Sequence, residues 1–335
     1  MVQEDSYAFI INPNAGKKKT RKKWESILEP ILKRENIDFK PYFTEKREHA
    51  MQLAQQAVLE DNFDNIIAVG GDGTFHEVIN GILDDTGNLI KNGIKTGIIC
   101  AGTGSDFIKT VGIPFDLEKS LEIILEGNTR ILDVLKGNLI TQDNNPIQKF
   151  SINVADAGLG GEVVDMVNRS KKIFGGKFTF MWAELKTMLK YKHKPTLVYL
   201  DDKEPVEIDL IAIFFGNCIF NGGGLRAATR AVPDDGLIDV FWLEGIRSKL
   251  KLITNLVKLY KDDESVQALL EKFEGFVHYN RYKKARIEPV PNSGAPDILI
   301  DFDGELVGKA PLEIEIVPKI VNVFSPTLGK NKKQE

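Results

Sequence analysis

Val69-Gly70-Gly71-Asp72-Gly73-Thr74 is the stretch that decides the fold, because a buried strand runs into it and a helix leaves it. The preceding run Asn65–Val69 is apolar with β-branched residues, which is typical of a strand buried on both faces. The following run Phe75–Leu83 carries apolar residues at helical spacing, and Thr74 is predicted to cap the start of this helix. The stretch therefore predicts a strand, a glycine turn and a helix in direct succession.

The composition of this turn predicts an anion site. Glycine allows positive φ and a close approach of the backbone to a ligand, and a helix start directs unpaired N–H groups at that ligand. Asp72 is unexpected there, because a carboxylate beside phosphates is unfavourable unless a cation neutralises both. The turn thus indicates a nucleotide phosphate, Mg²⁺ and a working carboxylate. The alternative is an ordinary tight turn, since neither Gly-x-Gly-x-x-Gly nor Gly-x-x-x-x-Gly-Lys-Ser/Thr is present.

Outward from this turn, strands and helices alternate through the first part of the chain. Further strands are predicted at Tyr7–Ile11, Asp38–Phe43 and Thr96–Cys100, with helical patterns between them. Such alternation is typical of a parallel α/β sheet, whose ligands bind outside the carboxyl ends of the strands. The polar, glycine-bearing loops that follow the first, third and fourth strands should therefore meet at one edge. This convergence predicts a nucleotide site.

The pattern changes near Asp133, after which strand-like segments follow one another with few helices. It predicts a second domain, a mainly antiparallel β-sandwich. The expected domains are residues 1–133, joined by a returning tail at 319–330, and residues 134–318. Two glycine clusters of the second domain, Ala157–Gly161 and Asn221–Gly224, could allow close approach to a substrate but are interpreted as β-bulges.

Bulk composition excludes some classes of protein. The chain has 335 residues and a formal net charge of −4, which argues against a general nucleic-acid binder. Cys100 and Cys218 lie in apolar runs without metal-like spacing, so they are expected to be reduced core residues of a cytoplasmic protein. The first residues do not resemble a signal peptide, and no apolar run approaches the roughly 18 residues of a spanning helix. Any membrane contact is expected to be peripheral.

Two charged stretches carry alternative interpretations. Asp301-Phe302-Asp303-Gly304-Glu305 is a hairpin turn, or a catalytic turn if it faces the glycine loops. Strand alternation would then place Asp303 and Glu305 on one side, where one takes a proton from a substrate hydroxyl and the other orients it. Lys17–Lys23 has six basic residues in seven and is either a solvated helix start or a surface for phosphates and anionic lipid.

Four of these segments, in this order, resemble the diacylglycerol-kinase catalytic family, and specifically its bacterial soluble lipid kinases. They are Asn12–Lys17, Gly70–Thr74, Gly102–Phe107 and Asp303–Glu305, and the resemblance runs over almost the whole length. The glycine loop alone is shared with NAD kinases and phosphofructokinases, so the four together are far more specific.

The resemblance implies an ATP site in a cleft between the two domains. It implies that Glu305 or Asp303 is the catalytic base and that Asp72 and Asp106 help to hold a catalytic Mg²⁺. It also implies a structural Mg²⁺ bound by Asp235 and the carbonyls of Val232 and Leu237. The nucleotide-binding residues that it implies are Asn12, Pro13, Asn14, Ala15, Gly16, Lys17, Thr44, Gly70, Gly71, Asp72, Gly73, Thr74, Phe75, His76, Thr103 and Asp106.

One departure from the family concerns an arginine after the opening motif, for which Lys22 is nearest in register with Arg21 beside it. Lysine cannot form the bidentate fork of an arginine, so the phosphate clamp is not assigned.

The sequence therefore predicts an ATP-dependent lipid kinase that transfers the γ-phosphate to a lipid hydroxyl, with diacylglycerol as the first expectation. The alternatives are an NAD kinase-like enzyme and a catalytically silent nucleotide- or lipid-binding regulator. The expected partner is a lipid at the inner face of the membrane, contacted through Lys17–Lys23 and through Ser170–Phe178. No nucleic-acid partner is expected, and a homodimer is left open.

Overall fold

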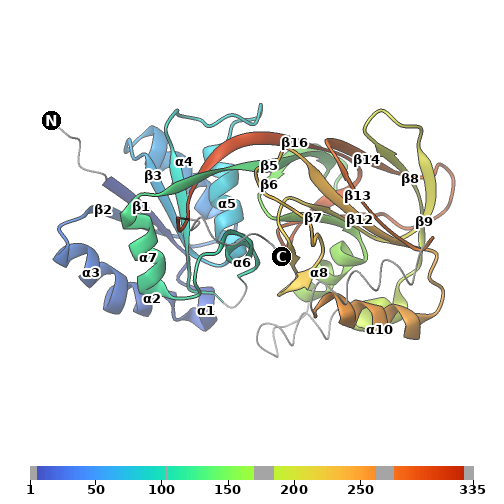
Figure 1. The fold of residues 1–335 in the computed structure, drawn as a ribbon, viewed down its shortest axis with the longest axis horizontal. Helices are drawn as coiled ribbons and strands as arrows, with labels where there is room; N and C mark the ends of the chain where they lie inside the picture. Colours follow the sequence, from blue (N-terminus) through green and yellow to red (C-terminus); the bar gives the residue numbers. More distant parts are fainter. Residues whose placement is uncertain (1–5, 103–104, 170–184, 262–274, 328–335) are drawn as a thin grey trace. The chain divides into compact units, whose positions relative to one another are not determined.

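The computed structural model in Figure 1 describes residues 6–102, 105–169, 185–261 and 275–327. The chain divides into two units, one comprising Met1–Leu132 and Lys319–Glu335 and the other Asp133–Pro318. Among the described residues, no helix is long and apolar enough to cross a membrane.

A parallel sheet forms the centre of unit 1, as the alternation of strands and helices predicted. Its order is β16-β4-β3-β1-β2, and β16 joins it only through its last residues, where Asn322 pairs with Lys95. Strand β3 is buried along its whole length, as an apolar run in the middle of a parallel sheet should be. The strands are β1 (Ser6–Ile11), β2 (Asp38–Phe43), β3 (Asn65–Gly70), β4 (Lys95–Cys100) and β16 (Glu305–Phe324).

Helices of unit 1 cover this sheet and supply its aromatic core. Trp24 and Phe9 are fully buried, with ring centroids 5.0 Å apart, and Phe324 from the end of β16 belongs to the same cluster. The helices are α1 (Ala15–Lys18), α2 (Thr20–Lys23), the π-helix η1 (Trp24–Leu28), α3 (Glu29–Arg34), α4 (His49–Leu59), α5 (Asp72–Ile82), α6 (Asp106–Val111) and α7 (Leu117–Glu126).

The start of α5 corrects one prediction. The helix begins at Asp72, and its N-cap is Gly71 in an extended conformation, so the assignment of Thr74 as the cap was wrong. The carbonyl of Gly71 already accepts hydrogen bonds from the N–H groups of Thr74 and Phe75, at 3.0 and 3.2 Å. Thr74 is buried inside the first turn, where its hydroxyl accepts a hydrogen bond from the opening loop instead.

Unit 2 contains a closed ring of six antiparallel strands, β7-β9-β8-β14-β16-β15, with β15 pairing back to β7. Its β-rich, antiparallel character confirms the prediction, but the strands form a barrel and not two facing sheets. The cause is the length of β16, which pairs with both β14 and β15 and so closes the ring. The buried side chains of the inner core include Ala155, Val198, Phe215, Ile287 and Phe302.

Other elements extend or cover this barrel (Figure 1). Strands β12 and β13 continue the sheet from β9, and β6 pairs with β5. The remaining barrel strands are β7 (Val154–Gly158), β8 (Lys194–Leu200), β9 (Val206–Gly216), β14 (Lys284–Pro289) and β15 (Leu299–Phe302). The others are β5 (Thr129–Ile140), β6 (Pro146–Ser151), β10 (Phe220–Asn221), β11 (Leu225–Arg226), β12 (Ile238–Glu244), β13 (Val277–Tyr282), α8 (Leu159–Arg169) and α10 (Lys249–Leu259).

Both glycine clusters of unit 2 differ from the predicted bulges. Ala157–Gly161 ends β7 and begins α8, and Asn221–Gly224 lies in the turn between β10 and β11. A Cβ atom at Gly160 would lie 2.0 Å from Oδ1 of Asp156, and one at Gly161 would lie 2.5 Å from a backbone oxygen of β15. Glycine is needed at these two positions because the helix start lies directly against the strands.

Candidate active site

Two glycine-bearing loops of unit 1 are in direct contact. The N–H groups of Ala101 and Gly102, which follow β4, both donate to the carbonyl of Gly70, at 2.8 and 3.0 Å. A Cβ atom on Gly70 would lie 2.4 Å from Oγ1 of Thr74, so the end of β3 and the first turn of α5 leave room only for glycine. The loops after β3 and β4 therefore form one backbone surface at the carboxyl edge of the sheet.

The opening motif joins this surface. Asn12 donates its backbone N–H to the carbonyl of Val69 at 3.0 Å, and its side-chain amide to the hydroxyl of Thr74 at 3.3 Å. Gly16 has φ of 56°, and a Cβ atom there would lie 2.2 Å from the carbonyl oxygen of Ala101. The first, third and fourth strands thus bring their loops together within unit 1.

The other residues expected at the nucleotide lie on the same loops or beside them. Thr44 is buried and donates its N–H to the carbonyl of Ile11 at 2.9 Å, which places the end of β2 next to the opening motif. Phe75 packs on Phe107 with ring centroids 4.9 Å apart, and Thr103 lies outside the described residues. Pro13, Asn14, Ala15 and Lys17 follow β1, while Gly71, Gly73 and His76 follow β3.

Asp72, in the loop after β3, is hydrogen-bonded to the start of α6, which follows the loop after β4. Its two carboxylate oxygens accept hydrogen bonds from the N–H groups of Asp106 and Phe107, at 3.0 and 3.3 Å. These are the first two residues of α6, whose N–H groups have no partner within the helix. Burial and the nearby charge of Asp72 raise the pKa of the Cys100 thiol to about 12. Asp72 is therefore a helix cap as well as a candidate metal ligand, and its oxygens retain further lone pairs.

Lys109 is a residue of this site that the sequence analysis missed. Its Nζ lies 2.6 Å from Oδ1 of Asp106, one turn earlier on α6, and the Asp106 carboxylate is buried. The i, i+3 spacing of the two residues was the available signal.

The guanidinium of Arg21 lies 4.4 Å from the centre of the Phe43 ring at the end of β2. This stacking places Arg21 close to the end of β2, although Arg21 and Lys22 are both exposed. The choice between them as a phosphate clamp stays a prediction.

In unit 2, Asp303 and Gly304 form a two-residue turn between β15 and β16. Phe302 pairs with Glu305, and the turn residues have φ of 54° and 85°, as in a type I′ hairpin. The prediction that strand alternation places Asp303 and Glu305 on one side was wrong, because the two residues are not on one continuous strand. The hairpin itself was one of the two interpretations of this stretch.

The carboxylate of Asp303 is buried among hydrogen-bond donors. The Ser151 hydroxyl donates to Oδ1 at 2.5 Å, and the N–H groups of Ile152, Asn153 and Val154 donate to the same carboxylate at 3.2, 3.0 and 3.2 Å. Four donors fix this group in place and occupy much of its acceptor capacity. Glu305, the first residue of β16, is half-buried. The choice between Asp303 and Glu305 as the base stays a prediction.

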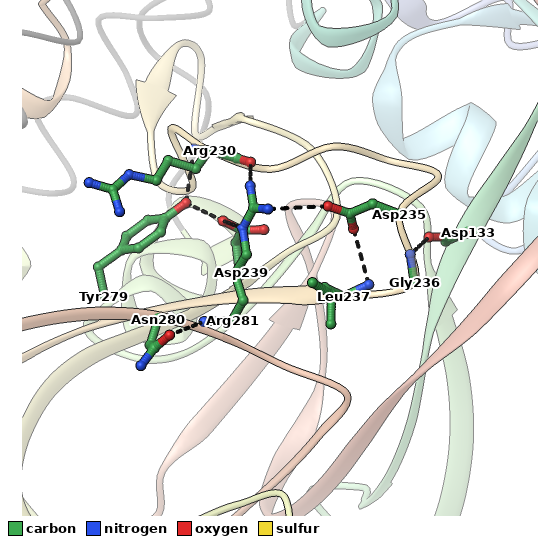
Figure 2. Close-up of polar contacts among 9 residues, drawn as sticks. All are labelled: Asp133, Arg230, Asp235, Gly236, Leu237, Asp239, Tyr279, Asn280 and Arg281. Carbon is green, nitrogen blue, oxygen red and sulfur yellow. Dashed lines mark hydrogen bonds and ion pairs between the residues drawn. The ribbon is translucent and has the colours of Figure 1, made fainter.

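The predicted structural Mg²⁺ site, in the turn before β12, is drawn in Figure 2. One carboxylate oxygen of Asp235 accepts the N–H of Leu237 at 3.1 Å, and the other lies 3.3 Å from Nη1 of Arg281. The guanidinium of Arg281 also donates to Asp239 at 3.3 Å and to the carbonyl of Arg230 (Figure 2). A metal ion at Asp235 would have to displace this guanidinium.

The groups expected to bind Mg²⁺ have protein partners in the structure, with which a metal ion would have to compete. The carbonyl of Val232 accepts the N–H groups of Asp234 and Asp235, at 2.9 and 3.3 Å. Over the described ranges of the chain, no group of three or more His, Cys, Asp or Glu residues is placed to hold a metal ion. The metal assignment of Val232, Asp235 and Leu237 stays a prediction that a Mg²⁺ titration can test.

Comparison with known proteins covers both units. Residues 6–137 match the diacylglycerol kinase catalytic domain, and residues 153–325 match the YegS C-terminal NAD kinase beta sandwich-like domain. A Staphylococcus saprophyticus protein named diacylglycerol kinase is 26% identical over 324 residues, which are 97% of this chain and 96% of that protein. A Mycobacterium tuberculosis protein of the same name is 29% identical over 299 residues, 89% and 88% of the two chains. The crystal structure of a diacylglycerol kinase from Bacillus anthracis has a TM-score of 0.66 at 19% identity, covering 98% and 99%.

Unit 1 is thus a parallel α/β sheet with three joined polar loops, and unit 2 is a β-rich unit built on an antiparallel barrel. The chain belongs to the diacylglycerol kinase catalytic family. Membership in this family of lipid kinases implies ATP as the phosphate donor.

Proposed function

We propose that the protein is an ATP-dependent lipid kinase that phosphorylates the hydroxyl of diacylglycerol and releases phosphatidic acid. The observation that carries the proposal is the contact among the loops after β1, β3 and β4, in a chain that matches the family along nearly its whole length.

The backbone of these loops suits phosphate groups. The start of α5 directs N–H groups and the positive end of its dipole toward this edge, and the glycines there permit a close approach. Asp72 and Asp106 supply the carboxylates that would hold Mg²⁺, and Lys109 balances part of their charge. When bound, ATP supplies the phosphoryl group and Mg²⁺ neutralises its phosphate charge.

Glu305 is assigned the role of general base. Its carboxylate accepts the proton of the acceptor hydroxyl as the hydroxyl oxygen forms its bond to the γ-phosphorus, and ADP leaves with the electrons of the broken bond. Asp303 holds the turn and takes no proton, because its carboxylate is already bound to four donors.

We also propose that the acceptor is presented at the inner face of the membrane, with the protein in the cytoplasm. Lys17, Lys18 and Lys19 are exposed, as are Arg21 and Lys22, so this run has cations available for anionic headgroups. Each cation near such a surface contributes about 1 kcal/mol, so the binding should be reversible and should weaken with salt. The second expected docking stretch, Ser170–Phe178, lies outside the described residues.

The test is an acceptor panel with labelled ATP and Mg²⁺, in mixed micelles where the acceptor is a lipid. Diacylglycerol, ceramide, sphingosine, phosphatidylglycerol and NAD are compared for wild type and for Glu305→Gln. Label in phosphatidic acid that is lost in Glu305→Gln supports the proposal. Label in NAD alone would favour an NAD kinase-like enzyme, and ATP or lipid binding without transfer would favour a silent regulator.

A further inference from the structure

Two carboxyl groups face each other on the wall of the barrel, where the proposed chemistry does not use them. Asp301 of β15 and Asp156 of β7 are opposite each other in the antiparallel register, and each is only 2% exposed. Their neighbours Ala155 and Phe302 belong to the inner core, so strand alternation puts the acidic pair on the outer face of the wall. Oδ1 of Asp156 is buried and has no hydrogen-bond donor among the described residues, unless the carboxyl group of Asp301 opposite it supplies one. A hydrogen bond between two carboxyl groups requires a proton on one of them.

The surroundings indicate which residue holds this proton. Asp156 accepts a hydrogen bond from the Asn221 amide at 3.0 Å, which favours its ionised form. Burial raises the pKa of Asp156 to about 6. Burial and the adjacent charge of Asp156 raise the pKa of Asp301 well above its usual value. Asp301 is therefore the member of the pair that we expect to hold the shared proton.

The groups that face the carboxyl groups of Asp156 and Asp301 come from the turn after β15, from α8 and from β10. Asp303 in the turn adds a negative charge that also raises the pKa of Asp301. Helix α8 presents Gly160 and Gly161, and β10 presents the neutral amide of Asn221.

Asp301 is also bound to the turn that carries the proposed base. Its Oδ1 accepts the N–H of Gly304 at 2.9 Å, and Gly304 directly precedes Glu305. On the other side of the turn, the Asp303 carboxylate is held by the donors of residues 151–154. The peptide group before Glu305 is thus held by Asp301, whose own position depends on the bond to Asp156.

An apolar cavity of about 60 Å³ adjoins this arrangement. Both carboxyl groups and Gly304 line it, together with apolar side chains that include Val163, Phe214 and Leu243. In such surroundings two ionised carboxylates in contact are unfavourable, because buried, mostly apolar surroundings screen their repulsion less than bulk water does. Loss of the shared proton should therefore separate the pair and shift the turn.

We propose that Asp301 is a positioning residue that acts as a neutral acid: it bridges Asp156 and the N–H of Gly304 and thereby holds Glu305 in its working position. The proposal rests on the proposed function, because it takes Glu305 to be the base. It adds a second proton-bearing group, on Asp301, to the one that Glu305 accepts from the lipid hydroxyl.

The kinetic experiment compares Asp301→Asn with Asp301→Ala, and uses Asp297→Asn as the matched control. Asp297 is an exposed aspartate of the same segment, paired with Lys309 at 3.0 Å. An asparagine retains a donor for Asp156 and an acceptor for Gly304, so kcat should stay within about threefold of wild type and its alkaline limb should move to higher pH. Alanine loses both bonds, and kcat should fall at least tenfold with KM for ATP unchanged. Equal losses in both variants, or an unmoved alkaline limb, would overturn the proposal.

A second measurement needs no catalysis. Because the acids have a higher pKa in the folded than in the unfolded protein, the folded state holds more protons above pH 4. Stability should therefore fall as pH rises from about 4 through the raised pKa values, and Asp301→Asn should flatten this slope while Asp297→Asn leaves it unchanged. If no lipid is phosphorylated but Asp301→Asn flattens the pH dependence of stability, the proposed function is wrong and the shared proton between Asp156 and Asp301 is supported. An unchanged slope in Asp301→Asn overturns the shared proton itself.

Discussion

Replacing Asp303 by alanine should destabilise the protein strongly, although the residue lies at the tip of a hairpin. The carboxylate serves one hydroxyl and three backbone N–H donors, on Ser151, Ile152, Asn153 and Val154, and all four residues are buried. A buried donor that loses its partner costs about 1–3 kcal/mol. At the low end of that range, four donors give a loss of about 4 kcal/mol in the free energy of unfolding.

Urea unfolding of Asp303→Ala, followed by tryptophan fluorescence, measures this loss. Asp303→Asn is the informative companion, because asparagine tolerates the positive φ of this position and keeps one acceptor oxygen. It should lose roughly half as much. Glu305→Gln is the matched control and should change the unfolding free energy by less than about 1 kcal/mol while lowering kcat by about 10²-fold or more. A loss below about 1 kcal/mol in Asp303→Ala would refute the anchoring role.

Three further outcomes are expected. Asp72→Asn should lower phosphoryl transfer by at least about 10²-fold. Loss of the negative charge at the N-terminus of α6 should cost about 0.3–1 kcal/mol in urea unfolding. Activity within a few-fold of wild type would remove Asp72 from the mechanism. If a metal ion binds at Asp235, Mg²⁺ should raise Tm, and Arg281→Met should lower the Mg²⁺ concentration needed for this rise. Asp235→Ala should abolish the rise. A wild-type Tm that changes with neither Mg²⁺ nor chelator would reject the metal site. Lys109→Met should lower the Mg²⁺ concentration that catalysis requires, because the Lys109 ammonium, 2.6 Å from Asp106, no longer competes with Mg²⁺ for this carboxylate. An unchanged requirement would mean that Lys109 does not act at this site.

Local patterns in the sequence were sufficient to predict the parallel sheet of unit 1 and the edge where its loops meet. Each parallel strand there is a short apolar run, and the loops after the strands carry the glycines and polar residues. Because parallel strands place their carboxyl ends at one edge, the meeting of these loops could be predicted, whereas the particular contacts of Gly70 with Ala101 and Gly102 could not. The start of α5 was predicted less well. Thr74 is a good capping residue by type, but the carbonyl of Gly71, three residues earlier, already accepts the first hydrogen bonds of the helix.

Unit 2 depends on pairings that no local pattern encodes. A sandwich and a barrel have the same alternation along each strand, and the difference lies in whether one long strand reaches partners on both sides. The same limit applies to the acidic pair, since Asp156 and Asp301 meet only through the register of β7 with β15. The roles of Asp303 and Glu305 were not separable either, because a two-residue turn breaks the alternation that linked them.

Strand β16 pairs with strands of both units, and this affects how the chain can fold while it is being synthesised. The outer neighbour of β4 is a segment near residue 322, which leaves the ribosome only after all of unit 2 has been made. Until then β4 presents an unpaired edge, and Gly97 lacks the ring of Phe324 that packs against it. Unpaired apolar edges are sites of misassembly in nascent chains. Expression of residues 1–132 alone should therefore give aggregated material, and adding the peptide 319–327 in trans is the simplest attempt to rescue it.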